Sequence, residues 1–264
     1  MYDKEVMAVL RALTSGTSGL NAQQTKVDTL ANNLANINTT GFKRSRAEFS
    51  ELIDQELEKG GIPVGAGNQN VTLGSGVYVA GVVKDFKPGG IIETGQPLDL
   101  AIQGEGFFKV LTPGGEERYT RDGSFSLDQE GNLVITSGCK LDGIQLEPGS
   151  NKIAVSPEGT VKAGEADSAT EAGQITLYRF TNMNGLKAEG ENLFSLDQAA
   201  GAAVSGNPGS EGFGSLRQGA LETANVDLVE EMANLIEAQR AYGFTSRTVR
   251  TADEMWGLAN NMRK

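Results

Sequence analysis

The chain of 264 residues contains no histidine and a single cysteine, Cys139. The lack of histidine removes the commonest metal ligand and general base, and one cysteine can form neither an intrachain disulfide nor a multi-cysteine metal site. A serine or cysteine nucleophile would lack its usual activating base, although the composition still allows a Ser–Lys pair. We therefore expect no cofactor, no metal site and no enzyme activity.

Basic residues are also scarce, since 23 Lys and Arg stand against 34 Asp and Glu, for a net charge of −11. Such a surface repels phosphate backbones and anionic lipid, which argues against nucleic acid as a partner. The only local basic cluster is Lys43, Arg44 and Arg46. Charges spaced in this way are typical of a solvated helix flank, and we interpret them as such.

Long apolar runs are missing as well. No stretch approaches the ~18 residues that a transmembrane helix needs. Near the N-terminus, Asp3, Lys4 and Glu5 are followed only by the short apolar run Val6–Leu10, which does not resemble a cleavable signal. We expect a protein without a membrane span that either stays in the cytosol or is exported without a cleaved signal peptide.

Both ends of the chain carry residues at seven-residue spacing, the pattern of a helix with one buried stripe. The predicted helices run from about Lys4 to Ile37 and from about Leu228 to Asn261, and each would be ~50 Å long. Because the lengths match, we expect an antiparallel coiled coil. The N-terminal series are Val6, Leu13, Leu20, Val27 and Leu34, and Val9, Gly16, Gln23, Leu30 and Ile37. The C-terminal series are Leu228, Leu235, Tyr242, Val249 and Trp256, and Glu231, Ala238, Thr245, Ala252 and Ala259.

Local signals mark the boundaries of both helices. Asp227 and Glu230 form an acidic variant of the capping box, and Glu230 lies where the helix dipole favours negative charge. The run Asn38–Gly41 consists of poor helix formers ending in a glycine suited to positive φ. The C-terminal helix is thus expected to begin at about residue 228, and the N-terminal helix to stop before Gly41.

Three asparagines, Asn32, Asn33 and Asn36, lie close together near the end of the first helix. Asparagine is a weak helix former, so a local interaction must favour it there. Two interpretations remain open. The asparagines either form a solvated face near a fraying helix end, or their amides bind a neighbouring subunit.

The centre of the chain is rich in glycine, and 35 glycines among 264 residues are nearly twice the usual share. Turn dipeptides separate short apolar runs, which predicts antiparallel strands. We expect an α+β fold with a mostly antiparallel β domain inserted between the two helices. The expected divisions are an N-terminal helix (1–41), a connecting segment that is helical or extended with a flexible loop (42–80), a central β domain (81–196), a flexible Gly/Ala/Ser-rich return connection (197–224) and a C-terminal helix (225–264).

Two short motifs could suggest ligand chemistry but do not support it. Gly104-Glu105-Gly106 lacks the third glycine and the following helix of a dinucleotide site, so a turn delivering Phe107 and Phe108 into strands is the better interpretation. Residues 128–132 alternate like the start of a calcium loop, but the spacing of Gly131 and the missing twelfth-position glutamate favour a hairpin turn.

Residues 31–44, ANNLANINTTGFKR, closely resemble the N-terminal signature of the bacterial flagellar basal-body rod and hook proteins. Further matching segments are PLDLAI (97–102), GEGFF (104–108), YTRDGSF (119–125), GENLF (190–194), QGALETANVD (218–227) and QRAY (239–242). Within the family the chain is most similar to distal rod members, because hook proteins carry additional domains and are longer. A proximal rod or hook subunit, and more remotely a coiled-coil adaptor or adhesin, are the alternatives.

The resemblance implies a structural subunit that polymerises helically into a hollow, torque-transmitting shaft, with the paired helices innermost around an export channel. Its partners would be further copies of itself, neighbouring rod and hook proteins and the flagellar export apparatus. Because the apolar stripes are covered only on assembly, we expect fraying ends in the free chain. The predicted subunit-packing residues are Leu13, Leu20, Val27, Leu30, Leu34, Ile37, Leu228, Leu235, Tyr242, Val249 and Trp256, and the family-motif residues are Asn32, Asn33, Asn36, Gly41 and Phe42.

Overall fold

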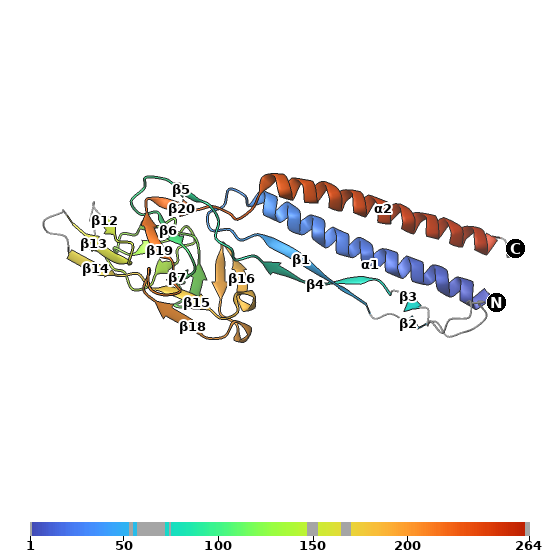
Figure 1. Cartoon of the computed structure of the whole chain (residues 1–264), viewed down its shortest axis with the longest axis horizontal. Helices are drawn as coiled ribbons and strands as arrows, with labels where there is room; N and C mark the ends of the chain where they lie inside the picture. Colours follow the sequence, from blue (N-terminus) through green and yellow to red (C-terminus); the bar gives the residue numbers. More distant parts are fainter. Residues whose placement is uncertain are drawn as a thin grey trace. The chain divides into compact units, whose positions relative to one another are not determined.

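The computed structural model describes residues 2–52, 55–56, 72–73, 75–146, 153–164 and 170–261. The chain divides into two compact units (Figure 1). The helical unit comprises Met1–Leu34, Ser45–Val83 and Leu228–Lys264, and the β unit comprises Ala35–Arg44 and Lys84–Asp227. The predicted α+β class, with a helix at each end of the chain and mostly antiparallel strands between them, is confirmed.

Two 34-residue helices form the framework of the helical unit, α1 (Tyr2–Ala35) and α2 (Leu228–Asn261). They lie side by side, with both chain ends at the same end of the pair (Figure 1). The bounds of α2 are those expected, whereas α1 ends two residues before Ile37. The reason is a turn after Ala35, in which the Thr39 amide donates to the Asn36 carbonyl at 3.0 Å and the Thr39 hydroxyl to the Asn36 side chain at 3.3 Å.

The connecting segment is extended rather than helical where it is described. Strand β1 (Ser45–Glu51) pairs with β4 (Val77–Lys84), and β2 (Gln55–Glu56) pairs with β3 (Thr72–Leu73). The β1–β4 ladder lies along α1, where the Val77 amide donates to the Ser18 hydroxyl at 3.3 Å. The α1 helix therefore has two partners in its own unit, a strand pair and α2. The flexible loop predicted around residues 60–70 lies outside the described residues.

Antiparallel sheets build the β unit, and its largest sheet contains nine strands. Its main path is β16–β17–β8–β7–β11–β10–β9, and β15 joins it by pairing with β7 and β18. The bounds are β7 (Phe107–Leu111), β8 (Glu117–Thr120), β9 (Ser126–Leu127), β10 (Leu133–Val134), β11 (Lys140–Leu141), β15 (Leu177–Phe180), β16 (Lys187–Gly190), β17 (Leu193–Ser195) and β18 (Ala203–Gly206).

Smaller sheets complete the β unit. The strands β12 (Ile153–Val155), β13 (Thr160–Ala163) and β14 (Thr170–Gln174) form one sheet, β6 (Leu100–Gln103) pairs with β19 (Ser215–Gln218), and β5 (Ile91–Glu93) pairs with β20 (Ala220–Glu222). Two short 3₁₀ helices, η1 (Met183–Gly185) and η2 (Gln198–Ala200), flank β16 and β17 in the chain.

Adjacent phenylalanines in β7 serve two different cores, because successive side chains of a strand point to opposite faces. Phe108 joins the main aliphatic core with Val110, and Phe107 joins an aromatic cluster with Phe86 and Phe180. The sequence predicted that a turn delivers Phe107 and Phe108 into a strand, which β7 confirms, and both rings are buried. The hairpin turn expected at residues 128–132 is also present, since the Gly131 amide donates to the Asp128 carbonyl at 3.0 Å.

Residues 197–224 differ from the flexible connection expected from their composition. They contain η2, β18, β19 and β20, and each of these strands pairs with an earlier strand of the β unit. Their small side chains suit this position, because Ala200 and Ala220 are fully buried. Composition alone suggested mobility, but backbone pairing to distant strands orders the segment.

Candidate functional site

The two long helices contact each other directly through small and polar residues. A Cβ added at Gly16 would lie 2.6 Å from Val249 Cγ2, and one added at Gly19 would lie 3.6 Å from Thr245 Cγ2. Further along, Asn33 Nδ2 donates to Glu231 Oε2 at 3.1 Å. As the residue number rises along α1 it falls along α2, so the helices run antiparallel. Gly16 permits a close approach that a side chain there would prevent, whereas a Cβ at Gly19 would have ordinary contact distance.

The predicted packing residues occupy several environments. Leu30 is buried, and Ile37 lies in the β unit beyond the end of α1. The exposed ones are Leu228 and Tyr242. Those that are partly buried are Leu13, Leu20, Val27, Leu34, Leu235, Val249 and Trp256. The most buried positions of the two helices include small residues from the alternate seven-residue series, such as Ala238 and Ala252. Packing of the named residues against neighbouring copies stays a prediction.

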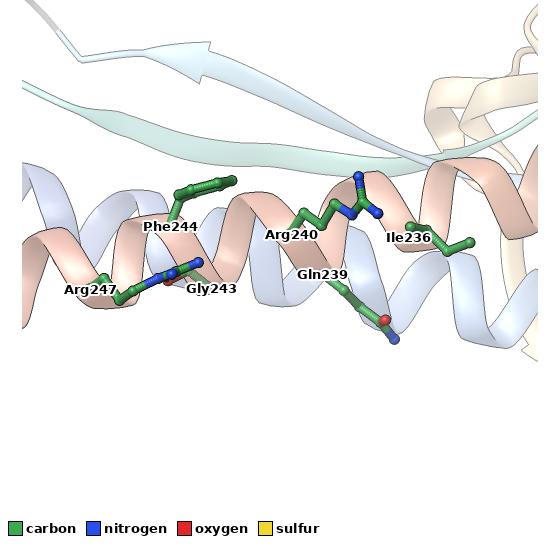
Figure 2. Close-up of a pocket in the computed structure, with 6 residues that line it drawn as sticks. All are labelled: Ile236, Gln239, Arg240, Gly243, Phe244 and Arg247. Carbon is green, nitrogen blue, oxygen red and sulfur yellow. Dashed lines mark hydrogen bonds between the residues drawn. The ribbon is translucent and has the colours of Figure 1, made fainter.

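A second set of apolar residues on α2 faces outward. Val229 is 76% exposed, Phe244 64% and Leu258 66%, and Met232, Ile236 and Met255 are also exposed. Around Phe244 the surface is hollowed, and the lining residues Ile236, Gln239, Arg240, Gly243, Phe244 and Arg247 follow one another along α2 (Figure 2). The Arg247 guanidinium lies 4.8 Å from the Phe244 ring centre. Within the described part of this chain, this face of α2 is open to a further apolar partner.

The three asparagines of the motif are not equivalent. Asn33 is fully buried, whereas Asn32 is exposed and Asn36 is partly buried. The Asn33 side chain binds the backbone of Ser45 through both its oxygen and its nitrogen, each at 2.8 Å. Its partners therefore lie in its own chain, and the interpretation of Asn33 as part of a solvated face is wrong. A contact of Asn32 or Asn36 with a neighbouring subunit stays a prediction.

The β unit contains a buried charge cluster that we name the Glu222 cluster, consisting of Lys43, Arg121 and Glu222. Lys43 Nζ lies 2.7 Å from Glu222 Oε1, and Arg121 Nη1 lies 3.0 Å from Glu222 Oε2. All three side chains are almost completely buried. Two cations thus share one carboxylate away from water, an arrangement that is stable only when the remaining polar atoms also find partners.

Backbone groups provide several of those partners. Lys43 Nζ donates to the Lys87 carbonyl at 2.8 Å, Arg121 Nη2 donates to the Gly104 carbonyl at 2.9 Å, and the Gly89 amide donates to Glu222 Oε1 at 2.9 Å. Burial lowers the pKa of Lys43 and also that of Arg121, and Glu222 opposes both shifts. The cluster is therefore held together mainly by its single carboxylate.

Additional bonds fix the segment around Lys43. The Gly41 amide donates to the Glu222 carbonyl at 2.9 Å, and the Arg44 amide donates to Asn225 Oδ1 at 2.7 Å. Gly41 has a φ of 65°, and an added Cβ would lie 2.7 Å from the Arg121 carbonyl carbon, so only glycine fits. The chain leaving α1 and the chain entering α2 are thus bonded to each other within the β unit.

Lys43 is not the solvated helix flank that the sequence predicted, because it is 1% exposed and ion-paired. Arg46 is exposed and pairs with Glu48, but it lies in strand β1, so it does not flank a helix either. The sequence interpretation treated the segments around Lys43, Arg121 and Glu222 as separate signatures. Their opposite charges were the only signal that could have joined them, and charge alone does not select partners among so many ionisable residues.

The described residues contain no group of three or more His, Cys, Asp or Glu side chains placed to hold a metal ion. Within the same ranges, no helix contains an apolar stretch long enough to cross a membrane.

Comparisons with known families match most of the segments that form these features. Residues 13–43 match the family described as flagella basal body rod protein, residues 101–163 the flagellar hook protein FlgE/F/G D1 domain, and residues 217–262 the flagellar basal body rod FlgEFG protein C-terminal region. The first includes Asn33 and Lys43, the second Arg121, and the third Glu222, Glu231 and the exposed face of α2.

Three relatives align along nearly the whole chain, and each is named flagellar basal-body rod protein FlgG. The protein of Borreliella burgdorferi is 44% identical over 267 residues, covering 97% of this chain and 100% of the relative. That of Caulobacter vibrioides is 41% identical, covering 96% and 100%, and that of Bacillus subtilis is 36% identical, covering 97% and 100%. Because the identity extends over both units, the chain belongs to the flagellar basal-body rod protein family, as a structural subunit of the rod.

Proposed function

We propose that this chain is the distal rod subunit and that it polymerises helically into a hollow shaft that surrounds the export channel and transmits torque. The relatives named FlgG align over their full lengths, which favours the distal rod over the longer hook proteins. We further propose that the protein has no catalytic activity, and that it reaches the basal body through the flagellar export apparatus. Its partners in the rod would be copies of itself and the adjoining rod and hook proteins.

The exposed apolar face of α2 is the observation that carries this proposal. Val229, Met232 and Ile236 recur at helical spacing, and Phe244 continues the exposed row beside the hollow. Burying one such side chain contributes ~1.5–3 kcal/mol, so a few of them supply a substantial contact energy. Heterologous contacts that do not close into a ring produce a filament, and a repeated helix face is suited to such contacts.

Within each subunit we propose that α1 and α2 form an antiparallel coiled coil, with the seven-residue series as its seam. The contacts of Gly16 with Val249 and of Gly19 with Thr245 support this pairing of the two helices. The Glu222 cluster supports the same arrangement, because it bonds the segment that follows α1 to the segment that precedes α2. Load carried by the helices would then enter the β unit through a bonded pair of segments.

Electron microscopy of the purified chain at high concentration tests assembly directly. We expect straight tubes from the unchanged chain and none from Phe244→Asp, because the substitution places a charge on the proposed contact face. The matched control is Phe244→Leu, which keeps an apolar side chain at the same position and should still form tubes. Tubes from Phe244→Asp, or a compact single particle from the unchanged chain at every concentration, would contradict the proposal.

A further inference from the structure

A buried polar contact joins three elements of the helical unit, α1, β1 and α2. Asn33 is completely buried, and Glu231 is 1% exposed. One N–H of the Asn33 amide donates to the Ser45 carbonyl at 2.8 Å and the other to Glu231 Oε2 at 3.1 Å, while its oxygen accepts from the Ser45 amide at 2.8 Å. Both N–H groups and the oxygen of the amide are therefore used, and Glu231 supplies its hydrogen bond to α2.

Apolar packing selects the alignment of these two helices only in part, at Gly16, where a shift of one heptad would present Tyr242 or Trp256 in place of Val249. Their seam repeats every seven residues, so a shift of one heptad again places seam against seam. Gly19 lies opposite Thr245, and a shifted α2 would present Ala238 or Ala252 instead. Neither alanine is larger than threonine, so Gly19 would tolerate both shifted alignments.

The polar pair does distinguish the alignments. A shift in one direction places Asn33 opposite Ala238 and moves Glu231 past the end of α1. A shift in the other direction places Glu231 opposite Lys26 and leaves Asn33 beyond the start of α2. In both cases the second N–H of Asn33 loses its acceptor, and an unpaired buried polar group costs more than a satisfied one contributes.

We propose that Asn33 and Glu231 are positioning residues that set the register of α1 against α2. Asn33 is fixed to β1 by its two bonds to Ser45, so Glu231 can reach the amide in one alignment of α2 only. Buried polar residues have this role in other helix pairs, where they fix register at some expense of stability. The inference goes beyond the proposed function, because it concerns contacts within one chain and requires no assembly.

The test compares two cysteine pairs in the full chain, each in a Cys139→Ser background. Gly19→Cys with Thr245→Cys reports the observed alignment, because the Gly19 Cβ position lies 3.6 Å from Thr245 Cγ2, close enough for a disulfide. Gly19→Cys with Ala252→Cys reports an alignment shifted by one heptad. Each pair is equilibrated with reduced and oxidised glutathione, in dilute and in concentrated protein, and intrachain disulfides are quantified after dissociation.

In the otherwise unchanged chain we expect the 19–245 disulfide to exceed the 19–252 disulfide by about tenfold or more, the ratio expected from one buried hydrogen bond to a charged group. Glu231→Leu should reduce this ratio by about tenfold, and any preference that remains is that of the Gly16 contact. Glu231→Gln, which retains an acceptor oxygen for Asn33, should preserve the ratio. Rescue by glutamine separates a hydrogen bond that sets register from a general effect of the residue on stability.

Several results would overturn the inference. They are an undiminished preference in Glu231→Leu, an equal loss in Glu231→Gln, loss of both disulfides in Glu231→Leu, or absence of the 19–245 disulfide from the unchanged chain in both dilute and concentrated protein. Failure of the proposed function looks different. The concentrated chain would then form no tubes, while the disulfide ratio, measured on single chains, would keep its value.

Discussion

Replacing Glu222 by glutamine removes the only negative charge that the Glu222 cluster contains. Lys43 and Arg121 would remain buried beside a neutral amide, which can accept a hydrogen bond but cannot balance two cations. Removing one partner of a buried ion pair costs about 3–5 kcal/mol. Since domains are stable by only about 5–15 kcal/mol, Glu222→Gln should remove at least about a fifth of the stability of the β unit.

Lys43→Met gives the internal comparison. It removes one of the two cations and leaves Glu222 bonded to Arg121 and to the Gly89 amide. The losses are two hydrogen bonds, those of Lys43 Nζ to Glu222 and to the Lys87 carbonyl, about 2–3 kcal/mol together. No buried charge is left unpaired, and a methionine side chain fills a similar volume. Glu222→Gln should therefore be clearly less stable than Lys43→Met, although each substitution removes one charge.

The assay is equilibrium unfolding in urea, followed by near-ultraviolet circular dichroism. Tyr119 and Tyr178 lie 5.5 Å apart in the β unit and give a signal from that unit, while the far-ultraviolet signal follows the helices. At unchanged slope, the shift in midpoint gives the change in free energy of unfolding. Glu130→Gln is the matched control, because its ion pair with Lys140 is exposed, and its midpoint should stay that of the unchanged chain.

The reasoning would be refuted if Glu222→Gln unfolded within about 1 kcal/mol of the unchanged chain, a difference too small for an unpaired buried charge. It would also be refuted if Lys43→Met were as damaging as Glu222→Gln. That result would mean that Lys43 contributes as much to the stability of the cluster as Glu222 does, and that the shared carboxylate does not organise the cluster.

Three further predictions follow from local geometry. Gly19→Ala should stabilise α1 by about 0.8–1 kcal/mol, because the added Cβ would lie at ordinary contact distance. Gly16→Ala should give no such gain unless Val249→Ala removes the 2.6 Å contact. Equal melting temperatures of the two single variants would contradict this. Gly41→Ala should cost at least about 1 kcal/mol in urea unfolding, because its φ of 65° disfavours a side chain, and an unchanged midpoint would sink the argument. Burial lowers the pKa of Lys43 below 10.5, so just below that pH the unfolded chain binds more protons than the folded chain. The free energy of unfolding of the unchanged chain should therefore rise relative to that of Lys43→Met from pH 8 toward pH 10.5. A difference in unfolding free energy that stays constant over this range would count against the shift.

Some elements of this fold were readable from the sequence because their causes are local. The seven-residue spacing and the acidic first turn located α2 at its observed bounds. The turn dipeptides similarly predicted antiparallel strands, and several of their glycines, such as Gly131 and Gly143, have positive φ. Where the cause was not local, prediction was poorer. The small residues of 197–224 suggested a flexible connection, but strand pairing with distant segments orders that region.

The same division holds for the candidate site. The seam residues were predicted from spacing, and their packing against neighbouring copies stays a prediction. Within the single chain, Leu228 and Tyr242 lie at the surface and Ala238 is buried. Helical periodicity locates the buried stripe of a helix only to within about one residue position. In addition, α1 packs against both a strand pair and a second helix. The role of Asn33 was missed for a related reason, because its partners Ser45 and Glu231 come from two other elements.

By itself, the sequence determined the helices, the β character of the centre and the family, since periodicity, turn residues and motif identity are all properties of neighbouring residues. Only the tertiary structure decided that Lys43, Arg121 and Glu222 form one buried cluster and that Asn33 meets Glu231. The physical reason is that an ion pair or a buried hydrogen bond depends on the distance between two atoms and on their separation from water. Both quantities are set by the way distant segments pack, and a sequence pattern contains neither.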